Sequence, residues 1–508
     1  MRRALTCALA AVALLAGCTA GEEKGGGSDP DALHILASSE LSDMEPILER
    51  VGADLGVPVE LSYAGTLDAV DRLAKGTADG RFDAVWLSSN DYLRLRPEAA
   101  RKIVSETTVM ASPVALGVKP ATLRELGWNP TDVTWSQVEK AVADGRLTYG
   151  MTDPSRSNSG FSTLISVASA LSGAQSALTD ADIAEARPRL KEFFQGQKLT
   201  SGSSGWLATA YRRRGNVDAL LNYESVLKGI PGLTVIRPRD GVVTADYPLS
   251  TLASADATDR DTVRRLGEAL RSPEIQREIT ERTHRRPVVA GGAPAAGLDT
   301  TRRRELPFPG SRSVADGLLD SYENELRRPS RTVYVLDTSG SMEGERLDGL
   351  KTALTGLTGD FREREEVTLM PFGSDVKSVR THVVDPADPR SGLDAIKKDT
   401  ASLEADGDTA IYTSLEKAYG RLGADEDTFT SIVLMTDGEN TAGADAGEFE
   451  DFYERLDGTA RQIPVFPILF GDSDRSELEH IADLTGGRLF DAQQGSLDGT
   501  FEEIRGYQ

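Results

Sequence analysis

The chain has 508 residues, which is too many for one compact core and predicts two or three domains. It carries 57 Lys and Arg against 80 Asp and Glu, a formal net charge of −23, and 39% of its residues are hydrophobic. This composition is typical of a globular protein and excludes nucleic acid as a partner, because the surface would repel phosphates. The acidity is concentrated in residues 331–508, which hold 17 basic and 37 acidic residues, a net charge of −20.

An apolar run over residues 4–16 follows Arg2 and Arg3. The run is too short to cross a bilayer as a helix. A positive start, a short apolar middle and small residues at its end instead predict a secretory signal peptide over residues 1–17. The Gly- and Ser-containing residues 18–30 that follow predict a flexible tether.

The signal peptide ends in Leu15-Ala16-Gly17-Cys18, which resembles a bacterial lipobox. The resemblance implies that Cys18 carries the lipid (diacyl, and palmitate-type N-acyl) and becomes the mature N-terminus, so that the protein is anchored at the extracellular face of the bacterial cell membrane. The alternative is an ordinary signal peptide with a chance cysteine. Since Cys7 would leave with the signal, the exported chain is expected to have no free thiol and no disulfide.

From Ala32 onward, short apolar runs alternate with amphipathic stretches, which is typical of an α/β fold with helices covering a sheet. The runs predict strands at 32–37, 59–62, 84–87, 114–118, 147–150, 218–221, 234–236 and 242–245, and helices starting at Ser42 or Asp43 and covering 261–270 and 273–280. Residues 290–309, rich in Gly, Ala, Pro and Arg, break the pattern. We therefore expect one domain over 31–290 and a linker over 291–330 that contains a helix at 313–326.

A second series of strands and helices follows the linker. The pattern predicts strands at 332–336, 367–370, 376–384, 431–435 and 464–470 and helices at 346–357 and 409–422. Together these predict a second α/β domain, with a wound sheet, over 331–508.

Polar side chains follow two strands of this second domain and begin one of its helices. Asp337, Ser339 and Ser341 follow the first strand, Thr409 opens a helix, and Asp437 ends a later strand. Loops at the carboxyl ends of strands meet at one edge of an open α/β sheet, where ligands bind. Hard oxygen ligands suit Mg²⁺ or Mn²⁺ better than zinc. One Asp-Ser turn alone would be no more than a helix cap.

The motif Asp337-x-Ser339-x-Ser341, followed along the chain by Thr409 and then by Asp437, resembles the metal-ion-dependent adhesion site (MIDAS) of the von Willebrand factor A (VWA) domain. The resemblance covers Arg331–Gln508. The resemblance implies a doubly wound, Rossmann-like fold with one Mg²⁺ or Mn²⁺. It implies that Ser339 and Ser341 bind the ion directly, Thr409 directly or through water, and Asp337 and Asp437 mostly through water. The open coordination position would take a carboxylate from a protein partner, so the domain would bind rather than catalyse.

Short polar side chains also follow the strands of the first domain. The candidate ligand-binding residues are Ser38, Ser39, Ser88, Asn90, Ser155, Ser157, Ser159 and Tyr223. Hydroxyl groups beside helix N-termini can bind anions or polar small molecules without a charged side chain. The alternative for each cluster is that it only caps a helix or forms a turn.

These clusters resemble an extracellular solute-binding protein of the two-lobed, hinged kind (periplasmic-binding-protein-like, type II), which includes phosphate, sulfate and molybdate binders. The resemblance spans Ala32–Pro287. The segments that carry it include Asp153–Gly160, Asn222-Tyr223-Glu224 and Arg285-Arg286-Pro287. The resemblance implies a small polar solute or oxyanion in a cleft between two lobes. A cleft-facing Glu224 would disfavour a multiply charged anion unless Arg156 or Arg212 offsets it.

Enzyme motifs do not support a catalytic role. Gly344–Thr352 nearly fits a phosphate loop, but Leu350 separates Gly349 from Lys351, and no G-x-S-x-G or H-E-x-x-H motif occurs. The leading hypothesis is a non-catalytic surface lipoprotein that binds a solute and, through its metal, a protein partner. The alternatives are a receptor coupled to an ABC transporter permease, whose VWA domain only docks an accessory protein, and a hydrolase hidden in the cleft.

Overall fold

The computed structural model describes residues 32–358, 361, 364–422, 428–493 and 497–507. The predicted signal peptide, Cys18 and the whole tether lie outside the described residues. Of the helices in the described part, none has the length and apolar character needed to cross a bilayer.

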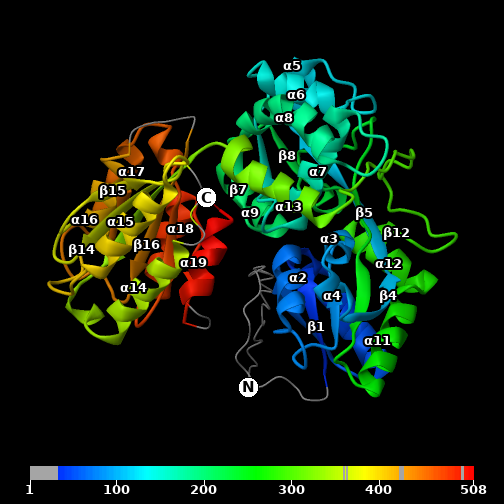
Figure 1. Ribbon diagram of the computed structural model, residues 1–508, viewed down its shortest axis with the longest axis horizontal. Coiled ribbons are helices and arrows are strands. Elements are labelled where there is room, and N and C mark those ends of the chain that lie inside the picture. The colour runs from blue at the N-terminus through cyan, green and yellow to red at the C-terminus, as the bar shows by residue number, and fades with distance from the viewer. Residues whose placement is uncertain (1–31, 359–360, 362–363, 423–427, 494–496, 508) are drawn as a thin grey trace, which may run out of the picture.

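The first domain has two lobes, each built on its own sheet (Figure 1). The sheet of lobe 1 has the order β2-β1-β3-β11-β4, and helices cover it. Its central strand β3 is buried on both faces and consists of apolar residues, as expected for a strand between helix layers. The elements of lobe 1 are β1 (Leu33–Ser38), η1 (Ser39–Met44), α1 (Glu45–Leu55), β2 (Val59–Ala64), α2 (Thr66–Lys75), β3 (Ala84–Trp86), α3 (Asp91–Arg94), α4 (Pro97–Ala100), β4 (Ile103–Thr108), β11 (Pro248–Leu252), α11 (Ala257–Leu270) and α12 (Pro273–Thr283).

Lobe 2 carries the sheet β10-β5-β8-β6-β7, with β9 and β12 pairing with β5. Its elements are β5 (Met110–Val118), α5 (Pro120–Leu126), α6 (Trp135–Ala143), β6 (Tyr149–Thr152), α7 (Asn158–Ser172), α8 (Asp180–Gln195), β7 (Gln197–Ser201), α9 (Ser204–Arg214), β8 (Ala219–Tyr223), α10 (Glu224–Lys228), β9 (Thr234–Ile236), β10 (Thr244–Ala245), β12 (Arg286–Pro287), α13 (Arg312–Ser321) and η2 (Tyr322–Leu326). Within the predicted linker, Leu318, Tyr322 and Leu326 join the core of this domain.

Three crossovers join the lobes. β4 leads into β5 through Val109, β10 leads back into β11 through Asp246 and Tyr247, and α12 leads into β12 through His284 and Arg285. The first two crossovers lie side by side, because the Val109 amide lies 3.4 Å from the Tyr247 carbonyl oxygen. Tyr247 has φ of +43°, a strained value for a residue with a side chain, so the turn between the lobes is held by its surroundings.

The C-terminal domain is one six-stranded sheet of order β15-β14-β13-β16-β17-β18, parallel except for the edge strand β15. Helices cover both faces around two apolar clusters. Its elements are β13 (Ser330–Asp337), η3 (Gly340–Met342), α14 (Glu345–Leu357), β14 (Glu366–Phe372), β15 (Arg380–Val383), α15 (Pro389–Ala401), α16 (Ile411–Tyr419), β16 (Phe429–Thr436), α17 (Ala446–Arg455), η4 (Ala460–Gln462), β17 (Val465–Leu469), α18 (Arg475–Thr485), β18 (Phe490–Asp491) and α19 (Leu497–Arg505).

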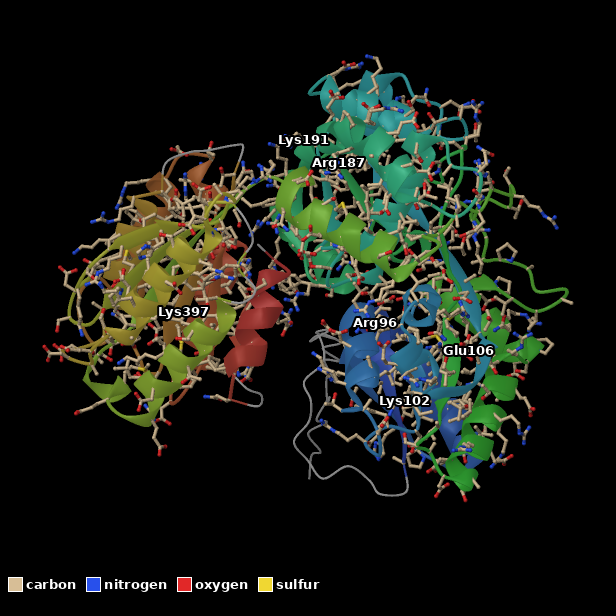
Figure 2. All side chains as sticks on the ribbon, in the orientation of Figure 1. Arg96, Lys102, Glu106, Arg187, Lys191 and Lys397 are labelled. Carbon is tan, nitrogen blue, oxygen red and sulfur yellow. The ribbon has the colours of Figure 1, made fainter. Side chains whose placement is uncertain are left out.

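The C-terminal domain contacts lobe 2 through a surface that we call the seam. In the seam, the Trp206 ring lies between the guanidinium groups of Arg213 and Arg488, 5.2 and 5.4 Å from its centroid. Arg214 donates two hydrogen bonds, of 3.0 and 2.6 Å, to the Gly486 carbonyl oxygen. Figure 1 shows the C-terminal domain, coloured yellow to red, beside lobe 2, and Figure 2 shows labelled charged side chains spread over both domains.

The structure confirms the α/β class of both domains and corrects several predicted elements. The helix expected from Ser42 or Asp43 begins at Glu45, because residues 39–44 form a 3-10 turn and Pro46 occupies the first turn of α1. The strand expected over 376–384 shrinks to Arg380–Val383 at the sheet edge. The sequence patterns also missed β4, β7 and β11, whose Ser, Thr and Gln residues interrupt the apolar runs.

Candidate functional site

The predicted metal-binding residues lie at the carboxyl-terminal edge of the C-terminal sheet. β13 ends at Asp337, and the following turn η3 is held against the loop before Thr409, because the Gly340 amide donates to the Gly407 carbonyl oxygen at 2.8 Å. β16, the neighbour of β13 in the sheet, ends at Thr436, directly before Asp437. The topology therefore brings three separate segments to one edge, as the sequence predicted.

Three of the side chains form a continuous chain of oxygens. Ser339 Oγ lies 3.0 Å from Ser341 Oγ, and Ser341 Oγ donates to Asp437 Oδ1 at 2.8 Å. Ser339 and Asp437 are buried, whereas Ser341 is exposed. The cluster therefore offers hydroxyl and carboxylate oxygens at a place that solvent can reach.

Asp337 and Thr409 lie around this cluster. Asp337 Oδ1 accepts from the Ser339 amide at 2.8 Å and Oδ2 accepts from Thr436 Oγ1 at 2.6 Å. Thr409 Oγ1 lies 4.0 Å from the position a Cβ would take on Gly438. Burial raises the pKa of Asp337, so a cation nearby would relieve the cost of its charge. The structure thus brings all five predicted metal residues to one place.

The donor set fits a hard divalent cation. It consists of oxygens alone, with two carboxylates and three hydroxyls, which is the set that Mg²⁺ or Mn²⁺ prefers. In the described part of the chain, no group of three or more His, Cys, Asp or Glu side chains is placed to hold a metal.

A basic residue that the sequence analysis did not single out already contacts this site. Arg346, at the start of α14, forms ion pairs with Asp437 at 2.5 Å and with Asp472 at 2.7 Å. Its guanidinium engages Asp437 Oδ2, while Ser341 engages Oδ1. Arg346 therefore supplies, from the same chain, a positive charge that neutralises the Asp437 carboxylate.

In lobe 1, the predicted cleft residues form a hydroxyl cluster at the ends of β1 and β3. Ser38 Oγ lies 3.0 Å from Thr66 Oγ1 and 3.1 Å from Ser88 Oγ, and it accepts from the Ser88 amide at 3.0 Å. Ser88 Oγ donates to Glu40 Oε1 at 2.6 Å. Glu40 was missed by sequence reasoning, although it follows Ser38 and Ser39 directly at the end of β1.

In lobe 2, a second hydroxyl cluster surrounds Ser159 at the N-terminus of α7. Ser159 Oγ lies 2.8 Å from Thr152 Oγ1, 3.2 Å from Ser157 Oγ and 2.7 Å from Ser204 Oγ. The neighbouring Asn158 donates to Tyr223 Oη at 2.7 Å. Thr152, Asn158 and Ser204 were not predicted.

The two clusters face each other across the cleft, and the lobes touch. A Cβ on Gly65 in lobe 1 would lie 2.2 Å from the Arg156 carbonyl oxygen in lobe 2. Burial raises the pKa of Tyr223 in lobe 2, and the negative charge of Glu40 in lobe 1 raises it further. The cleft is therefore closed at this point of contact.

The remaining predicted residues have local roles. Ser155 donates from its amide and its hydroxyl to Asp153 Oδ1, which makes a tight turn. Asn90 donates to Ser250 of β11 within lobe 1, and Ser39 begins η1. Ser155 and Asn90 are thus held by Asp153 and Ser250 and not by the hydroxyl groups around Ser38 and Ser159.

Glu224 does not present a free charge to the cleft. Its buried carboxylate accepts from Arg286 at 2.7 and 2.9 Å, and Arg237 lies 3.6 Å away. The offset expected from Arg156 or Arg212 is therefore supplied by Arg286 and Arg237. The unexpected charge in the cleft is that of Glu40.

The fold and the two sites define a two-lobed binding domain joined to an α/β domain with an oxygen-lined sheet edge. Residues 33–282 match the family model described as bacterial extracellular solute-binding protein. Residues 330–490 match the model described as von Willebrand factor type A domain. The chain thus combines a solute-binding domain with a VWA domain, and this combination supports a binding role.

Curated relatives match part of the chain. The protein sll0103 of Synechocystis is 35% identical over 126 residues, which is 24% of this chain and 28% of that protein. Inter-alpha-trypsin inhibitor heavy chain H1 of Bos taurus is 29% identical over 196 residues, which is 36% of this chain and 21% of that protein. The chain therefore spans less than a third of the length of these relatives.

Solved structures match each domain separately. The ferric binding protein from Campylobacter jejuni has a TM-score of 0.44 and 13% identity, covering 57% of this chain and 97% of that chain. A von Willebrand factor type A protein from Catenulispora acidiphila has a TM-score of 0.30 and 18% identity, covering 35% of this chain and 42% of that chain.

Proposed function

We propose that the protein is a non-catalytic lipoprotein of the bacterial cell surface with two binding sites. The solute-binding domain takes up a small polar solute between its lobes. The VWA domain holds Mg²⁺ or Mn²⁺ at Asp337, Ser339, Ser341, Thr409 and Asp437 and binds a carboxylate of a protein partner there. The observation that carries the proposal is the gathering of these five residues at one sheet edge.

The position of this edge also supports the proposal. The seam residues Phe429 and Pro464 lie at the amino-terminal ends of β16 and β17, whereas Asp337 and Asp437 follow the carboxyl-terminal ends of β13 and β16. An eight-residue strand spans about 25 Å, so the metal edge lies well away from the seam. A partner at the metal edge would not displace the solute-binding domain.

Metal binding can be tested without knowing the partner. We expect one Mn²⁺ per chain by electron paramagnetic resonance, and a rise of several degrees in the unfolding temperature of the VWA domain with Mg²⁺, by mass action. Asp337→Asn and Ser341→Ala should abolish both effects. Asp348→Asn, an exposed acid of α14 outside the motif, should retain them. Mn²⁺ binding that survives Asp337→Asn would refute the metal site.

The lipid anchor is a separate part of the proposal. Cys18→Ala should move the protein from the membrane fraction to the soluble fraction, because a lipidated cysteine is the proposed attachment. A variant that stays on the membrane would contradict the anchor without affecting the metal site.

A further inference from the structure

The cleft between the two lobes contains one carboxylate without an ion-pair partner. Glu40 accepts from Ser88 at 2.6 Å, and no Lys, Arg or His of the described residues forms an ion pair with it. Burial raises the pKa of Glu40, so its negative charge lacks full solvation and a cation beside it would stabilise that charge.

The basic side chains around the cleft are engaged by other acids. Arg285 is fully buried, and its Nη1 donates to both carboxylate oxygens of Asp43 at 2.7 and 2.6 Å, while Nη2 donates to the Glu40 carbonyl oxygen at 2.9 Å. Arg156 lies 3.7 Å from Asp68. Glu40, Asp43 and Arg285 together therefore sum to a charge of −1.

Two aromatic rings lie beside this charge. Tyr223 and Tyr247 are both buried, with their ring centroids 6.1 Å apart, and Glu40 acts electrostatically on both. The buried Tyr247 hydroxyl has no hydrogen-bond partner among the described residues. The Arg285 guanidinium already lies over the Tyr247 ring, 4.9 Å from its centroid, so the Glu40 carboxylate and the Tyr223 ring are the groups that remain for a ligand. A carboxylate beside a tyrosine ring and hydroxyl groups is the chemistry that recognises an organic ammonium group.

We infer that the solute of this cleft carries a protonated amine or quaternary ammonium group that Glu40 neutralises. An oxyanion would add a second negative charge next to Glu40, and Arg285, the cation that contacts the Glu40 backbone, is already paired with Asp43. A divalent metal ion would need more oxygen or nitrogen ligands than one carboxylate and these hydroxyls offer. The inference rests on the proposed solute-binding role and narrows its substrate class.

The test uses the mature full-length chain and three sets of probes at equal ionic strength. The cations are choline, agmatine and spermidine, the neutral solutes are ribose and inositol, and the anions are phosphate, sulfate and molybdate. The four Trp residues of the chain, at positions 86, 128, 135 and 206, all lie in the solute-binding domain, so Trp fluorescence follows the unfolding of that domain. Trp206 also contacts Arg488 in the seam, so the Trp206→Phe background removes the contribution of the C-terminal domain.

We expect at least one cation to raise the unfolding temperature by several degrees, with no rise from the anions. Glu40→Gln should remove the shift, and Glu49→Gln, which changes an exposed acid of α1, should keep it. A shift with anions or neutral solutes only, or a cation shift unchanged in Glu40→Gln, overturns the inference and leaves solute binding intact. No shift with any probe overturns the inference and counts against the solute-binding role as well.

Discussion

At the scale of single residues, Glu40 makes the stability of the solute-binding domain depend on pH. Burial raises the pKa of Glu40, against the lowering effects of Ser88 and Arg285. The folded domain therefore binds more protons than the unfolded chain at pH values above the ordinary pKa of a glutamate, and its stability falls as the pH rises through that window.

Glu40→Gln should remove part of this dependence. Gln keeps an acceptor for Ser88 but carries no charge, so the variant should unfold about 2–4 °C above the wild type at pH 7, corresponding to about 1 kcal/mol. The difference should vanish near pH 4, where both side chains are neutral. The unfolding temperatures of both proteins are measured by Trp fluorescence at pH 4 and at pH 7. The same difference between them at both pH values would show that the charge of Glu40 does not affect stability.

The ion pair of Arg346 leads to a second prediction, about the stability of the VWA domain with and without the proposed metal ion. Because its guanidinium pairs with Asp437, it competes with a cation for that carboxylate. Arg346→Gln should lower the unfolding temperature of the VWA domain without metal and enlarge the rise caused by Mg²⁺. Calorimetry with Mg²⁺ or EDTA measures both effects, and Arg455→Gln, on α17, serves as the control. A smaller Mg²⁺ effect in Arg346→Gln would mean that Arg346 supports the ion.

At the scale of elements, the close approach of the lobes depends on the glycine before α2. A Cβ on Gly65 would meet the Arg156 carbonyl oxygen at 2.2 Å, so Gly65→Ala should hold the lobes apart. We expect a larger radius of gyration by small-angle X-ray scattering and a weaker response to solute. Gly317→Ala, in α13 with no atom near its Cβ position, should leave the radius unchanged.

The elements also show what the sequence could and could not predict. β1, β13 and β16 were predicted because a strand buried between helix layers must be apolar throughout. The gathering of Asp337, Ser339 and Asp437 at one edge of the sheet was predicted because these residues follow the ends of such strands. β11 was missed because its serine and threonine are buried against polar partners, such as Asn90, that the local sequence does not reveal.

Only some of the cleft residues were predicted, because a local sequence pattern does not reveal contacts between distant parts of the chain. Ser38, Ser88 and Ser159 lie at strand ends or helix starts, where a local pattern can find them. The Glu40 carboxylate binds Ser88, 48 residues away, and Arg285 pairs with Asp43, 242 residues away, so no local pattern reveals either contact. Ser155 has the right spacing, but its hydrogen bonds turn back onto Asp153.

At the scale of the whole molecule, the seam joins the two domains through Trp206. Its ring lies between Arg213 and Arg488, so Trp206→Ala removes the shared contact and should let the domains separate. We expect a larger radius of gyration by small-angle scattering and a greater separation of the two calorimetric transitions. Trp206→Phe, which keeps an aromatic face, should change both much less. An unchanged radius in Trp206→Ala would show that the remaining seam contacts suffice.

The two attachment points of the solute-binding domain lie on different lobes. The described chain enters through β1 of lobe 1, whereas the VWA domain is attached to lobe 2. A mechanical load applied between the N-terminal end and the sheet edge at Asp337 must therefore pass from lobe 1 to lobe 2, through the crossovers at Val109, Tyr247 and Arg285 and through the contacts across the cleft. Pulling the ends apart opens the lobes, so a molecule closed on its solute should yield less to stretching than an empty one.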